Sequence, residues 1–252
     1  MKVFDQGSGS AVVVIQGLHG RWEWSAPALR ALARTCRTLS YSLLAKASAF
    51  DQLIAQLDAV LDERGVRGAA ICGVSFGGLV AIRYAAVRPE RTQKLVIVSS
   101  PSPFWRPTAR QARYLSRPWL STPAFVAGSP FRLWPEIRAA FDSSMDALHF
   151  VLRHSLRVAA APIVPAAMAA RLALASGEDF VADCARVTAP TLVVTGEDAL
   201  DTVVPAQSTR EYARLIRGAR LNTIDRTGHL GLITRPDSFA HVVGHFVNAK
   251  HS

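Results

Sequence analysis

Three residues of this chain have the types and the local settings that nucleophilic catalysis requires. Ser75 lies in a G-x-S-x-G pattern at residues 73–77, Asp201 opens a D-x-x-V-P pattern, and His229 lies in T-G-H-L. A serine hydroxyl is a weak nucleophile until a base takes its proton, and the base needs a carboxylate that holds its tautomer. Ser75, Asp201 and His229 therefore form a candidate catalytic triad that would act through an acyl-enzyme.

The pattern around Ser75 gains meaning from the elements on either side of it. Residues 69–72 form a short apolar run typical of a buried strand, and apolar residues from 79 to 86 recur at helical spacing. A serine on a sharp strand-to-helix turn needs small neighbours, since larger side chains would collide with the strand and the helix. Such a turn exposes the hydroxyl and aims the amide of Phe76 at the group that it attacks. A glycine-rich turn with an incidental serine is the alternative, which the other motifs disfavour.

The acid is less well defined by spacing than the serine and the histidine. Asp201 and Asp198 both follow the strand expected at 191–195, and a helix cap or a solvated loop would also explain either aspartate. We choose Asp201 as the acid and keep Asp198 as the reserve. Asp225 is disfavoured because it lies only four residues before His229 and would have to fold back.

Metal chemistry has little support in the sequence. His241 and His245 have the spacing of a zinc-binding helix, but the intervening residues include no glutamate and no third ligand is evident. We therefore expect no metal and no organic cofactor.

The loop after the apolar run at 11–15 is placed to stabilise an oxyanion. It reads QGLHG over residues 16–20. Gly17 permits close approach of the backbone, and the amide of Leu18 would face the reacting carbonyl together with the amide of Phe76. We interpret His19 as a residue that lines the substrate pocket.

Strands and helices alternate along most of the chain. Strands are expected at residues 2–5, 11–15, 38–43, 69–72, 94–100, 191–195 and 220–224, and helices at 25–34, 50–63, 207–216 and 239–249 and after Ser75. The alternation is interrupted by expected helices at 108–115, 134–141, 146–158 and 166–175. This pattern predicts an α/β protein with a mostly parallel sheet flanked by helices. Residues 1–100 and 187–252 would form its core, and residues 101–186 an inserted helical lid.

Composition narrows the choice of partners and compartment. Of the 29 basic residues only four are lysines, and the arginines are spread along the chain, so the net charge of +10 does not predict nucleic-acid binding. No apolar run is long enough for a membrane span, and the first residues lack the layout of a signal peptide. Three cysteines in apolar settings favour free thiols in a reducing compartment, with the cytoplasm as the default. We expect a monomer or a homodimer without stable membrane insertion.

The order of these motifs resembles the α/β-hydrolase superfamily, and most of all its small lidded esterases and C–C hydrolases. The resemblance extends from about Val3 to Val247 and rests on GVSFGG, QGLHG, D-x-x-V-P and TGHL. It implies that Leu18 and Phe76 form the oxyanion hole and that residues 101–186 form the lid. Two features depart from the family pattern. Gln16 replaces the usual histidine, and residues 42–46 replace a longer glycine-rich turn that shapes the pocket rim.

The expected activity is hydrolysis of carboxylic esters of small to medium, mainly apolar substrates. Aromatic residues of the lid, including Trp105 and Trp134, would contribute to an apolar substrate pocket. A C–C bond hydrolase or an acyl-homoserine lactonase with the same triad is the alternative, and arginines of the lid could then pair with a substrate carboxylate: Arg106, Arg110, Arg113, Arg153 and Arg157. A ligand receptor on this fold with little turnover is a more distant alternative, which the intact triad disfavours.

Overall fold

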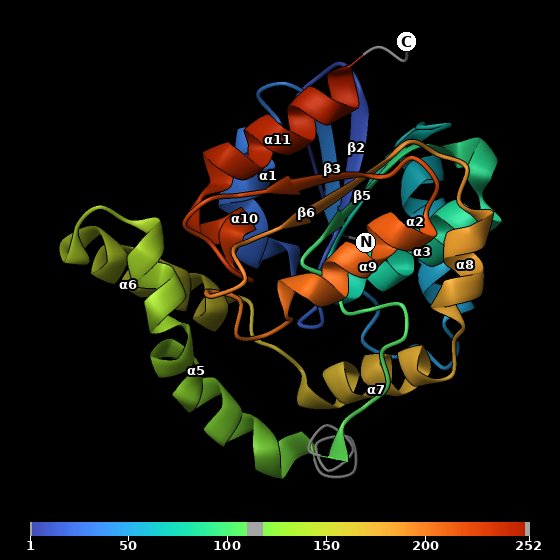
Figure 1. The fold of residues 1–252 in the computed structure, drawn as a ribbon. Coiled ribbons are helices and arrows are strands. Elements are labelled where there is room, and N and C mark those ends of the chain that lie inside the picture. Colours follow the sequence, from blue (N-terminus) through green and yellow to red (C-terminus); the bar gives the residue numbers. More distant parts are fainter. Residues whose placement is uncertain (1, 110–117, 250–252) are drawn as a thin grey trace.

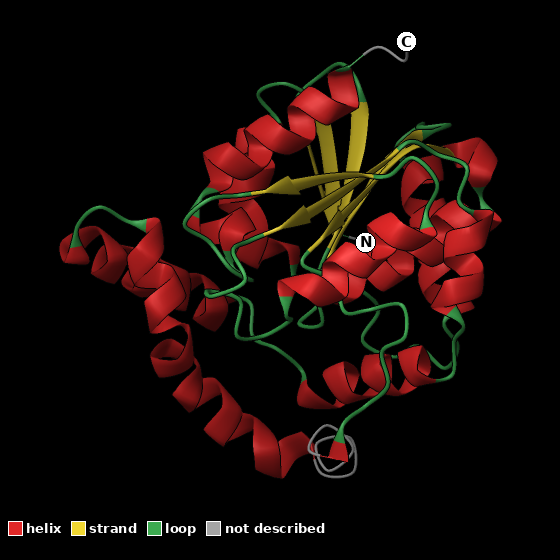
Figure 2. Ribbon diagram, in the orientation of Figure 1, coloured by secondary structure: helices red, strands yellow, loops and turns green. Residues whose placement is uncertain are grey.

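The computed structural model describes residues 2–109 and 118–249, which fold around one twisted β-sheet (Figures 1 and 2). The described residues contribute seven strands, in the spatial order β1-β3-β2-β4-β5-β6-β7. Their bounds are β1 Val3–Gln6, β2 Ala11–Ile15, β3 Arg37–Tyr41, β4 Ala69–Val74, β5 Thr92–Val98, β6 Thr191–Thr195 and β7 Arg220–Thr223. Only β1 runs antiparallel to its neighbour, β3. The predicted α/β fold class is therefore confirmed.

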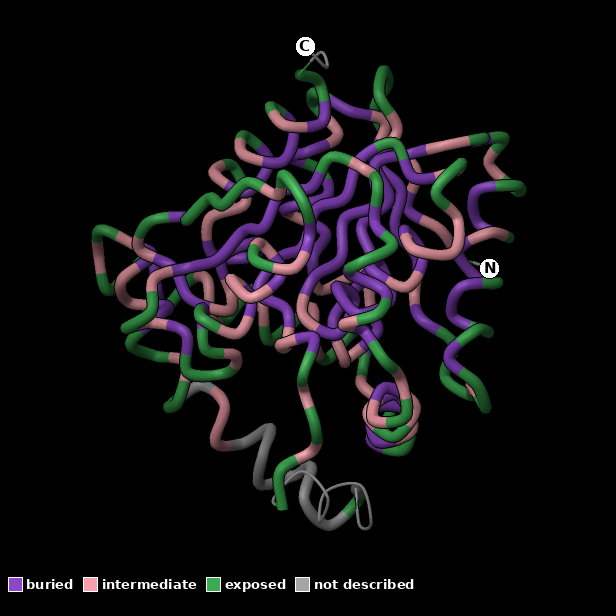
Figure 3. Tube along the Cα trace, turned by 45° about the vertical axis from the view of Figure 1, so that its right-hand side comes forward, coloured by how far each residue is buried: buried purple, intermediate pink, exposed green. Residues whose placement is uncertain are grey.

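The central strands are buried on both faces. All residues of β4 and β6 are buried, and so are four of the five residues of β2. In the register of the sheet, Val13 lies between Leu39 of β3 and Ile71 of β4. Uncharged, β-branched runs of this kind suit a parallel sheet with helices on both sides. Figure 3 shows the result as a buried centre within an exposed outer layer.

Helices cover the two faces of the sheet and form two hydrophobic clusters with it (Figure 1). One face carries α1 (Ala26–Leu32), α10 (Gly231–Thr234) and α11 (Pro236–Asn248). The other carries α2 (Asp51–Glu63), α3 (Phe76–Val87), α8 (Phe180–Arg186) and α9 (Ala206–Leu215). Short 3₁₀ helices occur at Trp22–Ser25 and Pro89–Arg91.

A helical insertion, defined here as the residues between β5 and β6, extends from the sheet (Figure 1). After residue 118 it contains α5 (Pro118–Ala140), α6 (Ser144–Ala160), α7 (Pro165–Ser176) and α8. The last helix packs against α3, with Phe180 and Cys184 in the hydrophobic cluster, so α8 belongs to the layer that covers the sheet.

Most expected elements are present, with differences inside the insertion. The helix expected at 134–141 is the end of the much longer α5, which continues through prolines at 123, 130 and 135. The helix expected at 108–115 lies largely outside the described residues. Two short helices, α8 and α10, were not expected from the sequence.

Within the described ranges, no single helix has both the length and the apolar character needed to cross a membrane. The pair α6 and α7, bent by 90° at the break between them, meets that test only when the two are taken together.

Candidate active site

Four loops that carry the predicted site residues follow parallel strands. Gly17 and Leu18 follow β2, Ser75 follows β4, Asp201 follows β6, and His229 follows β7. Because parallel strands end at the same edge of a sheet, all four loops lie along its carboxyl edge.

The turn between β4 and α3 holds Ser75 in a backbone conformation that is rare for a residue with a side chain. Its φ is 53° and its ψ is −123°, and its amide donates to the Val98 carbonyl at 2.8 Å. Gly77 has no room for a side chain, since a Cβ there would lie 2.3 Å from the Ile15 carbonyl oxygen. Close packing of the turn against β2 therefore keeps the Ser75 backbone in this strained conformation. Backbone strain of this kind is typical of functional sites.

The structure brings Asp201, rather than Asp198, to His229. Asp201 Oδ2 lies 3.6 Å from His229 Nδ1, slightly beyond hydrogen-bond distance, and neither atom has a hydrogen-bond partner among the described residues. The Asp201 side chain is 1% exposed. Its Oδ1 accepts from the amides of Val203 and Val204 at 3.0 and 2.8 Å, which fixes the carboxylate with Oδ2 toward the imidazole.

Asp198 has a different environment in the same loop. Its side chain is 63% exposed, and both of its oxygens accept from Arg210 Nη1, at 2.9 and 2.7 Å. It is therefore a solvated partner of α9.

The loops that carry Asp201 and His229 are packed backbone to backbone. The Glu197 amide donates to the Thr227 carbonyl at 2.7 Å. A Cβ at Gly228 would lie 2.5 Å from the Leu200 carbonyl oxygen, so only glycine permits this approach. The distance between the aspartate and the histidine is thus set by the main chain.

Gly17 lies directly against Ser75. A Cβ at Gly17 would be 3.3 Å from the Ser75 Cβ. The Gly17 carbonyl accepts from the Gly20 amide at 2.8 Å, and because a trans peptide directs its carbonyl and amide to opposite sides, the Leu18 amide points away from that turn. The Phe76 amide belongs to the first residue of α3, where a helix supplies no acceptor of its own. The Leu18 amide is therefore directed away from this turn, and the Phe76 amide directly follows Ser75.

Arg171 of α7 fastens this loop to the insertion. Its guanidinium is buried and donates to three main-chain carbonyls, those of Leu18 (2.8 Å), Leu43 (3.0 Å) and Leu44 (2.9 Å). Burial lowers the pKa of Arg171 to about 10, so the side chain is still a cation at neutral pH.

His19 belongs to an aromatic wall that joins the Gly17 loop to α6. Its ring stacks on Trp24, with centroids 4.4 Å apart, and Trp24 Nε1 donates to the Ala161 carbonyl at 2.9 Å. His154 of α6 meets Trp24 edge-on and stacks on Phe150. This wall is defined by His19, Trp24, His154 and Phe150.

Both histidines of the aromatic wall are neutral near pH 7. Burial, with a smaller effect of the Arg171 charge, lowers the pKa of His19 to about 3. Burial, with a smaller effect of Arg157, lowers the pKa of His154 to about 4. His19 Nδ1 accepts from the Arg21 amide at 3.0 Å, which places the His19 proton on Nε2.

The two tryptophans predicted to bind substrate have different positions. Trp105 is partly buried and packs against the hydrophobic cluster that includes Phe76. Leu18 packs against the same cluster. Trp134, on α5, is 39% exposed.

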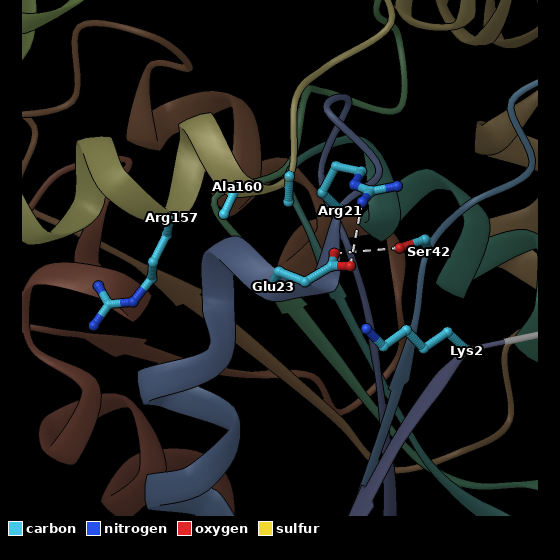
Figure 4. Close-up of a pocket in the computed structure, with 7 residues that line it drawn as sticks. Lys2, Arg21, Glu23, Ser42, Arg157 and Ala160 are labelled. Carbon is cyan, nitrogen blue, oxygen red and sulfur yellow. Dashed lines mark hydrogen bonds and ion pairs between the residues drawn. The ribbon is translucent and has the colours of Figure 1, made fainter.

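Figure 4 shows a pocket of about 480 Å³. Ala161 belongs to its lining, and the carbonyl of Ala161 accepts from Trp24 of the aromatic wall. The pocket lining consists of Lys2, Arg21, Glu23, Ser42, Arg157, Ala160 and Ala161. It includes Arg157, one of the arginines considered for a substrate carboxylate, but none of the predicted triad or oxyanion-hole residues. Glu23 accepts from Arg21 at 3.2 Å and from Ser42 at 3.5 Å, while the guanidinium of Arg157 points away from Glu23.

Sequence reasoning missed Glu136 and Arg171, which contact the site loops from α5 and α7. Arg171 is the one charged residue of the otherwise apolar helix α7, and that isolation is a signal in the sequence. Glu136 is the one acidic residue of α5, but Arg132 and Arg138 lie close to it, so its sequence context does not distinguish it. In the part of the chain that the structure describes, no group of three or more His, Cys, Asp or Glu side chains could hold a metal ion.

Comparisons with known proteins identify the family of the chain. The family model described as "Alpha/beta hydrolase family" matches residues 12–242. The chain is 27% identical over 260 residues to "Putative carbamate hydrolase RutD" of Pseudomonas savastanoi pv. phaseolicola, across 95% of this chain and 94% of that protein. It is 29% identical over 194 residues to the pimeloyl-[acyl-carrier protein] methyl ester esterase of Nitrosomonas europaea, across 73% of each.

A solved structure extends the similarity to three dimensions. The enol-lactonase of Burkholderia xenovorans matches with a TM-score of 0.78 at 20% identity, covering 98% of this chain and 96% of that chain. At this level of identity the likeness establishes a shared fold.

Proposed function

Because the chain belongs to the alpha/beta hydrolase family, we propose that it is a serine hydrolase that cleaves carboxylic esters of small to medium, mainly apolar substrates. The observation that carries this proposal is the backbone of Ser75, which has a φ of 53° on a strand-to-helix turn with Gly17 against its Cβ. A serine on such a turn has an exposed hydroxyl, and acyl transfer would also require the amides of Leu18 and Phe76 to act as donors to the oxyanion.

In the proposed mechanism His229 takes the proton of Ser75 as its oxygen attacks the ester carbonyl. Asp201 holds the imidazole with Nδ1 toward its carboxylate and stabilises the imidazolium that forms. The distance between Asp201 Oδ2 and His229 Nδ1 is 3.6 Å, so the proposed mechanism requires these two atoms to move closer to form a hydrogen bond.

The amides of Leu18 and Phe76 hold the negative charge that develops on the carbonyl oxygen. The imidazolium then protonates the leaving alcohol, which leaves an acyl group on Ser75. A water molecule, deprotonated by His229, attacks this acyl-enzyme and regenerates the serine. No step in this sequence requires a metal ion or an organic cofactor.

The preference for apolar substrates is supported by the walls around the site. His19 and His154 are neutral, since burial lowers the pKa of each far below 7, and both rings stack on aromatic neighbours. An uncharged aromatic wall favours acyl or aryl groups over charged ones. The sequence-based division gives residues 101–186 to the lid, but α8 packs against α3 on the sheet. We propose that the part of the helical insertion before α8 acts as the lid over this site.

The test is hydrolysis of p-nitrophenyl esters from short to long acyl chains by the wild type, Ser75→Ala and Ser48→Ala. Ser48 is an exposed serine far from the predicted site in the sequence and serves as the control. The proposal predicts a maximum at one chain length for the wild type and for Ser48→Ala, with a rate at least about 10³-fold lower for Ser75→Ala. Equal rates for wild type and Ser75→Ala would contradict it.

A further inference from the structure

A buried carboxylate from α5 lies against the loop that carries His229. Glu136 is 2% exposed. Its Oε1 accepts from the Gly228 amide at 2.8 Å and from the Leu230 amide. Gly228 and Leu230 are the residues immediately before and after His229. One oxygen atom of Glu136 therefore accepts hydrogen bonds from the main chain on both sides of the histidine.

Burial of Glu136 as an ionised carboxylate is unfavourable for the free energy of folding. Its Oε2 is buried without a hydrogen-bond donor among the residues that the structure describes. Burial raises the pKa of Glu136 to about 7, although the two amides and His229 act in the opposite direction, and the charge of Asp201 raises it further. An apolar side chain at this position would avoid the desolvation of a carboxylate. A costly group at a candidate site suggests a role in function.

The His229 loop is held from two sides. On the side of β6, the Arg226 amide donates to Glu197 Oε1 at 2.6 Å, and Asp201 faces the imidazole. On the side of the insertion, Arg226 Nε donates to the Ala139 carbonyl at 2.8 Å. These contacts involve Arg226 and the His229 ring, whereas Glu136 accepts from the amides of Gly228 and Leu230, which flank His229. Gly228 also packs closely against the Leu200 main chain.

We propose that Glu136 is a positioning residue, which holds the His229 loop from the helical insertion so that Nδ1 faces Asp201. The inference rests on the proposed function, in which His229 is the base. Because Glu136 belongs to α5, the orientation of the His229 imidazole depends on how the C-terminal end of α5 packs against the His229 loop. The residue acts through the loop and need not touch the substrate.

A positioning role predicts which kinetic constant changes. If the imidazole is misaligned, proton transfer slows while the pocket still binds substrate. Glu136→Ala should therefore lower kcat by about 10- to 100-fold with little change in KM. Glu136→Gln keeps an oxygen that can accept from both amides, so its kcat should be substantially higher than that of Glu136→Ala.

Asp142→Asn is the matched control. Asp142 follows α5, has a 91% exposed side chain and pairs with Arg226, but does not contact the amides beside His229. This variant should keep the wild-type kcat. Equal kcat values for Glu136→Ala, Asp142→Asn and the wild type would overturn the proposal.

A second readout keeps the inference separate from the proposed activity. Nitrogen-15 NMR of histidine-labelled protein, with the His229 signals identified by their loss in His229→Ala, reports the tautomer of the ring. We expect one fixed tautomer with the proton on Nδ1 in the wild type and in Glu136→Gln, and an averaged mixture in Glu136→Ala. An unchanged His229 spectrum in Glu136→Ala would overturn the positioning role, whether or not the protein hydrolyses esters.

If Glu136→Ala fails to fold, Glu136→Gln together with Glu136→Met replaces it. Loss of the fixed tautomer in Glu136→Met, with its retention in Glu136→Gln, would support the proposal. The fixed tautomer in both would overturn it. Inactivity of the wild type toward all esters would count against the proposed function, while the tautomer measurement would still decide the role of Glu136.

Discussion

Two aspartates three residues apart in one loop have opposite environments. Asp201 is buried, is oriented by two amides and faces His229, whereas Asp198 is solvated and paired with Arg210. A carboxylate can hold an imidazole only if its own orientation is fixed, and only Asp201 meets that condition.

Exchanging each aspartate for asparagine tests this distinction. Asp201→Asn should lower kcat by about 10³- to 10⁴-fold, because the amide favours the wrong imidazole tautomer. Asp198→Asn removes only a solvated ion pair and should remain within about twofold of the wild type. Steady-state ester hydrolysis by the two variants is the measurement, and a larger loss in Asp198→Asn would reverse the assignment.

Several individual residues of the site could be anticipated from the sequence, and others could not. Ser75 and His229 lie in short patterns whose backbone requirements are local, so the sequence singles them out. The choice between Asp201 and Asp198 depends on which side chain turns inward, which spacing within a loop does not specify. Glu136 reaches its partners across more than 90 residues of chain, and no local pattern encodes that contact.

At the scale of elements, α7 is connected to the core by one buried guanidinium. Arg171 satisfies the carbonyls of Leu18, Leu43 and Leu44, which belong to loops after two different strands. Since Leu18 also offers its amide to the proposed oxyanion, this helix helps to fix the geometry of the Gly17 loop.

Replacing the guanidinium should affect both stability and rate. Arg171→Met leaves three carbonyls without their donor and should lower the free energy of unfolding by about 2–4 kcal/mol. The loosened Leu18 peptide should also lower kcat by roughly tenfold or more. Arg153→Met, at an exposed arginine of α6, is the control, and urea unfolding with ester kinetics provides both numbers. Arg171→Met that behaves like Arg153→Met would show that the contact is dispensable.

The elements themselves were predictable where their pattern is simple. The apolar, β-branched runs of β2, β5 and β6 identify buried strands directly. The sequence pattern predicts only the last part of α5, because internal prolines normally end or kink a helix. Its full length depends on tertiary contacts that the sequence pattern does not contain.

At the scale of the whole molecule, the buried Glu136 links stability to pH. Burial raises the pKa of its carboxyl from 4.5 to about 7 in the folded protein. Folding favours the protonated form of Glu136. Its contribution to the stability of the folded protein is therefore fully present below about pH 4.5 and is lost as the pH rises toward 7. His19 and His154 act in the opposite sense, because burial lowers the pKa of each and folding favours their neutral forms.

Comparison with Glu136→Gln isolates the carboxyl contribution. The stability of Glu136→Gln relative to the wild type should increase by on the order of 2–3 kcal/mol between pH 4.5 and pH 8, since only the wild type must bury an ionised carboxylate at the higher pH. Thermal or urea unfolding of both proteins across this range is the measurement. A stability difference that does not change with pH would mean that Glu136 is not buried as a titrating group.

The central claim is that Ser75 is an activated nucleophile, and covalent labelling tests it most directly. The protein would be treated with diethyl p-nitrophenyl phosphate and digested with trypsin, and the modified peptide located by mass spectrometry. Residues 68–83 form the tryptic peptide between Arg67 and Arg83, and Ser75 is its only hydroxyl-bearing residue. The account predicts that the diethylphosphoryl group is found on this peptide, that release of p-nitrophenol is stoichiometric, and that both are absent in His229→Ala. An unlabelled peptide in the wild type, or equal labelling in His229→Ala, would contradict it.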